Sequence, residues 1–74
     1  MAQRFLQLAD VAEELNISPR QALTLLQNGE IRGIQVGPKR IWRVEAAELE
    51  AYIQRMYVET EARMAERVAQ PEEH

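Results

Sequence analysis

The sequence predicts a small, mainly α-helical domain with one short β-hairpin, in the order helix, helix, strand, strand and long helix. Three observations carry this prediction. A short segment ending at Gly29 contains the signals for both ends of a helix, an apolar alternation is interrupted by Gly37 and Pro38, and helical spacing runs without Pro or Gly from Ala46 to Pro71. The 74 residues contain no internal repeat and form a single domain with a small core.

The best-defined element is a helix predicted from Pro19 to Asn28. Ser18 is a preferred N-cap residue, and Pro19 suits the first helical position. Gln21 stands where the partner of a capping box belongs. Gly29 can adopt the left-handed conformation that ends a helix. Both ends of this helix are therefore specified by local sequence.

A shorter helix is predicted before it, from about Leu8 to Asn16, with its acidic residues on the face opposite the apolar ones. A tight turn at residues 16–18 joins the two helices. The buried faces predicted from this spacing are Leu8, Val11, Ala12 and Leu15 in the first helix, and Ala22, Leu25 and Leu26 in the second.

A β-hairpin follows, with strands at Ile34–Val36 and Ile41–Val44 and a loop at Gly37–Arg40. Because side chains alternate along a strand, we expect one face of the hairpin to pack on the helices and the other to face solvent. The inward residues are predicted to be Ile34, Val36, Trp42 and Val44, and the outward residues Gln35, Ile41 and Arg43. Two helices across a tight turn, followed by a hairpin, are the arrangement of a winged helix-turn-helix (α-α-β-β-α).

From Ala46 onward, apolar residues again recur at steps of three and four, which predicts one long C-terminal helix. Such a helix is longer than the small body can cover, so its outer half is expected either to be solvated or to pack on another chain. The seam expected to support a homodimer consists of Leu49, Ile53, Met56, Thr60 and Met64. We therefore divide the chain into a winged helix-turn-helix domain at 1–57, a helical extension at 58–70 and a disordered tail at 71–74.

The composition argues against an enzyme. The chain has no cysteine, and its one histidine is His74, so neither a thiolate metal site nor a nucleophile with a histidine base is available. We expect no cofactor and no metal. The first residues lack the apolar run of a secretion signal, and no segment is long enough to cross a membrane. A cytoplasmic protein is the expectation.

The net charge of −3 conceals a basic middle section. The sections 1–15 and 45–74 are acidic overall, whereas the section 16–44 contains a single acidic residue. Its basic residues are Arg20, Arg32, Lys39, Arg40 and Arg43. Because a polyanion responds to the local field rather than to the net charge, double-stranded DNA is the expected partner of this section.

The side chains expected to contact DNA lie on the second helix and on the hairpin. Major-groove recognition needs side chains that present donors and acceptors near the start of the recognition helix, and phosphate contact needs cations. The residues that meet these needs are Arg20, Gln21 and Thr24 for bases, and Asn28, Lys39, Arg40 and Arg43 for phosphates.

The residues also resemble the excisionase-type helix-turn-helix proteins, which are relatives of the MerR winged-helix group. The resemblance covers about residues 5–55. The matching pieces are residues 8–18 (LADVAEELNIS), Gly29-Glu30-Ile31, Ile34-Gln35-Val36-Gly37, Trp42-Arg43-Val44 and residues 49–53 (LEAYI).

This resemblance implies a small DNA-binding protein that acts in excision of mobile elements, in DNA architecture or in regulation of transcription. It places recognition-helix roles on Ser18, Arg20, Gln21 and Thr24, and wing roles on the three hairpin cations. Many relatives have a basic residue in place of Thr24 and a polar or aromatic one in place of Leu23. These departures leave an alternative open, in which the acidic C-terminal helix is a protein-interaction surface and DNA binding is weak or absent.

Overall fold

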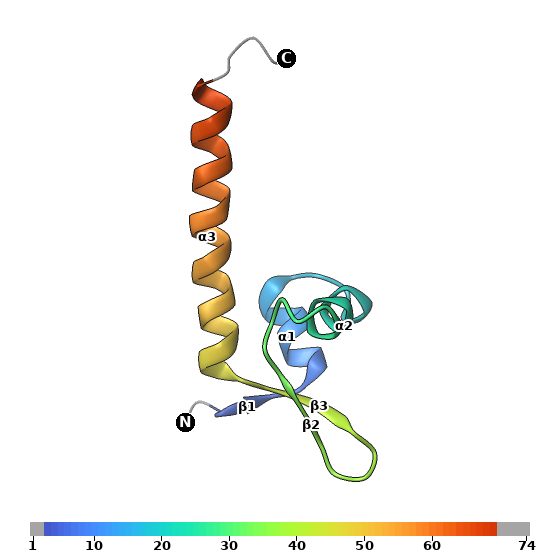
Figure 1. The fold of residues 1–74 in the computed structure, drawn as a ribbon. Helices are drawn as coiled ribbons and strands as arrows, with labels where there is room; N and C mark the ends of the chain where they lie inside the picture. Colours follow the sequence, from blue (N-terminus) through green and yellow to red (C-terminus); the bar gives the residue numbers. More distant parts are fainter. Residues whose placement is uncertain (1–2, 70–74) are drawn as a thin grey trace.

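The computed structural model describes residues 3–69, with side chains to residue 67, and confirms the mainly helical class with a long C-terminal helix. The predicted tail at 71–74 lies outside the described residues. Within that range the elements are β1 (Phe5–Leu6), α1 (Leu8–Leu15), α2 (Pro19–Gln27), β2 (Ile34–Val36), β3 (Ile41–Glu45) and α3 (Ala46–Ala69). Figure 1 shows α1 and α2 packed beside the base of α3, and the β2–β3 hairpin projecting beyond them.

The turn between α1 and α2 is built from two back-to-back caps. Asn16 adopts the left-handed conformation with φ of 56°, and the Ile17 N–H donates to the carbonyl of Ala12 at 2.9 Å. This is a Schellman ending, in which asparagine takes the place of the more usual glycine. Ser18 then caps α2 directly, so three residues end one helix and begin the next.

Helix α2 ends in the same type of hydrogen-bonded cap, with glycine in the left-handed position. Gly29 has φ of 77°, its N–H donates to Leu26, and the Glu30 N–H donates to the carbonyl of Leu25 at 2.9 Å. The predicted stop at Gly29 is therefore confirmed, and Asn28 is the C-cap rather than the last helical residue.

A three-stranded antiparallel sheet has β3 in the middle, between β1 and β2. Strand β1 was not predicted, since two residues carry no alternation. It pairs Phe5 with Glu45 and Leu6 with Val44. The hairpin strands β2 and β3 were predicted to within one residue.

The predicted facing of β2 was wrong. The loop Gly37–Arg40 places Val36 opposite Ile41 and Ile34 opposite Arg43. Residues directly opposite each other in an antiparallel pair share a face, so Ile34 and Val36 lie with Ile41 and Arg43, not with Trp42. Ile34 and Val36 are accordingly 51% and 47% exposed. The prediction places even-numbered residues of both strands on one face. The four-residue loop instead puts the even-numbered residues of β2 on the same face as the odd-numbered residues of β3.

The inner face of the sheet carries Leu6, Trp42 and Val44 and covers the two short helices. Val44 is fully buried, whereas Trp42 is half-buried. Among the described residues the core consists of Val11, Ala12, Ala22, Leu26, Ile31, Val44 and Leu49. This set draws on α1, α2, the segment before β2, β3 and α3, so one small core holds the elements together.

Helix α3 has two parts in different surroundings. Its first turns pack on the body through Leu49, Tyr52 and Ile53. Every residue from Tyr57 to Arg67 is exposed. Leu49 is only 4% exposed and belongs to this chain's own core, so the predicted dimer seam loses that member.

Over residues 3–69, no helix combines the length and apolarity needed to cross a bilayer.

The register of the hairpin makes a testable prediction from two identical substitutions. We expect Val44→Ala to lower the free energy of unfolding by about 2 kcal/mol, because it empties part of a sealed core. Val36→Ala should cost about 0.5 kcal/mol or less, because its side chain is exposed on the outer face. Urea unfolding monitored by circular dichroism measures both. Equal losses would contradict the observed register.

Candidate nucleic-acid interface

The start of α2 is fixed by a reciprocal capping box. The Gln21 N–H donates to Ser18 Oγ at 3.1 Å, and the Ser18 N–H donates to Gln21 Oε1 at 3.0 Å. Pro19 occupies the first helical turn. Both side chains predicted for DNA contact are thus held at the helix start, and the amide NH2 group of Gln21 is what remains to face a partner.

One exposed face of α2 brings several predicted residues together. Arg20, Thr24 and Asn28 are exposed and recur at steps of four, so they lie along one side of the helix. The Thr24 hydroxyl donates to the Arg20 carbonyl at 3.1 Å, which leaves its oxygen able to accept a hydrogen bond. Gln27 is exposed on the same side, three residues after Thr24. The sequence-based site omitted Gln27, although its helical spacing indicates it.

The hairpin tip presents two of the three predicted wing cations. Lys39 and Arg40 are exposed within the turn, where the Arg40 N–H donates to the Gly37 carbonyl at 3.1 Å. Gln35 Nε2 also donates to the Arg40 carbonyl at 3.3 Å and braces the turn from the strand. Figure 1 shows this tip extended away from the outer half of α3.

Arg43 is placed differently from the other two. It is half-buried at the base of the hairpin, opposite Ile34 on the outer face. Its Nη1 donates to the Trp42 carbonyl at 2.7 Å, and it lines a pocket together with Arg32, Glu45 and Glu48. The structure therefore does not bring Arg43 together with the cations of the tip.

Two other basic residues near the body, Arg4 and Arg32, form ion pairs with acids. Arg4 contacts Glu45 at 3.1 Å and Arg32 contacts Glu48 at 3.5 Å. In the part of the chain with described side chains, Arg20, Lys39 and Arg40 form no ion pair within 4.0 Å. The exposed cations that form no ion pair in this part of the chain therefore include those at the start of α2 and at the hairpin tip.

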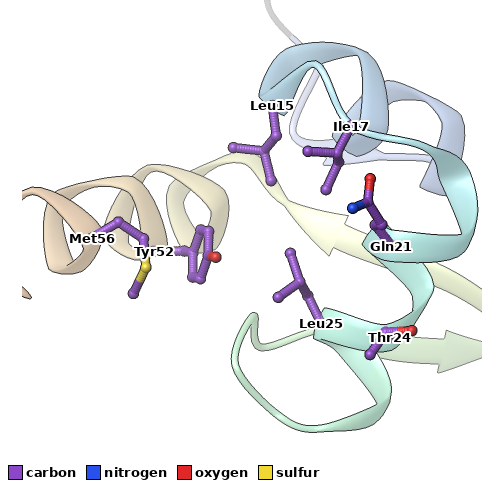
Figure 2. A pocket seen from close by; sticks show the side chains of 7 residues that line it. All are labelled: Leu15, Ile17, Gln21, Thr24, Leu25, Tyr52 and Met56. Carbon is purple, nitrogen blue, oxygen red and sulfur yellow. The ribbon is translucent and has the colours of Figure 1, made fainter. Parts of the chain in front are cut away.

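An apolar groove of about 520 Å³ separates α2 from α3. Figure 2 shows Leu25 of α2 facing Tyr52 and Met56 of α3, with Gln21 and Thr24 at the α2 edge. The rest of the lining comes from Leu15 and Ile17. Gln21 therefore lies at the boundary between this groove and the exposed face of α2.

The Tyr52 hydroxyl gives the groove a polar end. Partial burial, followed by the charge of Glu30, raises the pKa of the Tyr52 phenol above its ordinary value, and Arg55 opposes this shift. The hydroxyl therefore stays protonated at neutral pH. Arg55 is itself tied to the body by a hydrogen bond to the Glu30 carbonyl.

The two capped helices and the projecting hairpin define a winged helix-turn-helix class of protein. The model of the family described as helix-turn-helix domain matches residues 5–57. The chain belongs to this family of DNA-binding domains, whose members are typically not enzymes. No curated protein and no solved structure gives a significant match.

The capping box predicts a selective loss of stability at the start of α2. Ser18→Ala removes the acceptor for the Gln21 N–H and should lower the free energy of unfolding by about 1 kcal/mol. Ser18→Asp keeps an acceptor at the same position and should retain most of that stability. Urea unfolding of the two variants beside the unchanged protein checks the expectation, and a fully stable alanine variant would contradict it.

Proposed function

We propose that this DNA-binding protein inserts α2 into the major groove of duplex DNA and places the hairpin tip on the phosphate backbone. The observation that carries the proposal is the joint exposure of Arg20, Lys39 and Arg40, none of which is neutralised by a described acidic side chain. A basic helix start followed by a basic hairpin tip fits the two successive contacts of a winged helix-turn-helix on DNA.

Base reading in this proposal falls on the exposed face of α2. Arg20 suits the acceptors of guanine, and the amide of Gln21 suits adenine. Thr24 lies one turn further on and offers its hydroxyl oxygen, and Gln27 extends the same row. Ser18 contributes by holding the helix start. Because the Gln21 carbonyl oxygen is already bonded to Ser18, we expect only modest discrimination among bases.

Phosphate contacts supply most of the affinity in this proposal. Lys39 and Arg40 reach the backbone from the tip, and Asn28 reaches it from the end of α2. Arg43 is the third wing cation proposed to contact phosphate. Its half-buried position beside two carboxylates gives it the smallest expected share.

The proposed biological role is regulation of transcription or excision-type DNA architecture, the two roles that the excisionase-type and MerR-like resemblance suggests. Neither role requires chemistry by the protein. In this proposal residues 1–57 form the DNA-binding unit and residues 58–70 form a separate extension. The alternative of a protein-interaction surface rests on one observation, the exposure of α3 from Tyr57 to Arg67.

Salt dependence tests the phosphate contacts. With three to four contacts per protomer, the logarithm of the association constant for duplex DNA should fall against the logarithm of salt concentration with a slope of about −3 to −4. Replacing Lys39 and Arg40 together with alanine should reduce the slope by about 2. Fluorescence anisotropy at several salt concentrations measures these slopes.

Arg63→Ala is the matched control for that experiment, because it removes a cation from the outer half of α3 and should leave the slope unchanged. The unchanged protein failing to bind duplex DNA even at low salt would reject the proposed function.

Gln21→Glu separates reading of DNA from stability of the helix. Glutamate is an accepted capping-box partner, so the Ser18 N–H keeps its acceptor and the unfolding midpoint should not fall. A carboxylate facing the base edges in the DNA major groove should weaken DNA binding by about tenfold or more. Gln3→Glu makes the same change of charge outside α2 and should bind like the unchanged protein. Equal affinities of the two variants would remove Gln21 from the interface.

A further inference from the structure

The outer half of α3 is an unusual surface for so small a domain. Tyr57, Val58 and Met64 are 62%, 65% and 54% exposed, and the longest dimension of the described chain is 53 Å because this helix projects from the body. Amphipathic helices draw most of their stability from a packed apolar face. The outer half of α3 has such a face without a partner among the described residues.

A heptad-like row of three apolar residues and one threonine runs along this side of α3. Ile53, Tyr57, Thr60 and Met64 follow one another at steps of four, three and four, which keeps them on one side of the helix. Val58 lies outside the row. The row begins at the body, where Ile53 is half-buried, and ends near the described end of α3.

At its inner end the row enters a groove of about 320 Å³ between α1 and α3. The apolar floor of this groove is formed by Leu6, Leu49 and Ile53. Its acidic residues are Asp10, Glu13, Glu14 and Glu50, and its other lining residues, Gln3 and Ala46, are uncharged. An occupant of this groove should therefore combine an apolar side chain with a cation.

We propose that the occupant is α3 of a second copy of this chain, packed antiparallel. In an antiparallel pair of heptad helices, each a position of one helix lies against a d position of its partner. With Tyr57 opposite Thr60 of the second copy, Ile53 lies opposite Met64. The same register sets Glu50 opposite Arg67.

Charge selects this orientation. The antiparallel pair brings Arg67 of each copy to Glu50 and to the acidic groove of the other, once at each end. A parallel pair would set Glu50 against Glu50 and Arg67 against Arg67. The overlap from Glu50 to Arg67 covers about five helical turns, or roughly 27 Å, and the groove on α1 extends the contact beyond the two helices.

The structure also explains which predicted seam residues take part. Leu49 is buried in its own core, and Met56 lines the other groove, on the side opposite Leu25. The seam is therefore Ile53, Tyr57, Thr60 and Met64. This pairing does not depend on DNA binding, although it would place two recognition helices on opposite ends of a two-fold dimer.

Sedimentation velocity of the full chain over a series of concentrations tests the pairing. The unchanged protein should dimerise. Met64→Glu should weaken the dimer by at least about tenfold, because it sets two carboxylates into the apolar seam. Val58→Glu adds the same charge outside the seam and should leave the dimer intact. Circular dichroism verifies that both variants fold. A monomer at every concentration would overturn the proposal, and so would equal behaviour of the two variants.

Charge reversal tests the orientation. Glu50→Arg and Arg67→Glu should each weaken self-association, because each homodimer then sets like charges together at both ends. An equimolar mixture of the two variants should recover a dimer, since every pair across the interface is again of opposite charge. Weakening of both single variants, together with recovery of the mixture, supports the antiparallel register. Single variants that dimerise as well as the unchanged protein would reject it.

Discussion

The pairing of the central strand β3 is the interaction on which the rest of the structure depends. This strand bonds to β1 on one side and to β2 on the other, and Val44 fills the centre of the core. Its last residue, Glu45, is followed at once by the first residue of α3. A core this small has no second layer, so the hairpin, the N-terminal strand and the long helix are all positioned by the same five residues.

Sequence alone predicted the parts of the fold that are settled within a few residues. The capping box of Ser18 and Gln21 and the glycine ending at Gly29 involve partners no more than five residues apart. Strand β1 could not be found in this way, because Phe5 and Leu6 become a strand only through pairing with residues about forty positions later. The facing of Ile34 failed for a related reason: it depends on the register that the turn sets.

In the candidate site, too, the features set by local spacing could be predicted and those set by strand register could not. Helical period correctly indicates that Arg20 and Thr24 share an exposed face, and it includes Gln27 when it is applied to the whole of α2. The position of Arg43 depends on the hairpin register and was beyond reach of pattern alone. Periodicity also gave a single stripe along α3. It could not separate Leu49, which serves this chain's own core, from Met64, which lies beyond the body.

The direct junction between β3 and α3 has a mechanical consequence. No loop separates Glu45 from Ala46, and the Ala46 N–H is bonded to the Arg4 carbonyl at 2.7 Å, so few backbone torsions remain there to absorb motion. Strand β3 and helix α3 are then expected to move together as one rigid unit about the small core. A sideways displacement of the outer half of α3 would then tilt the hairpin tip, with no change needed inside α1 or α2.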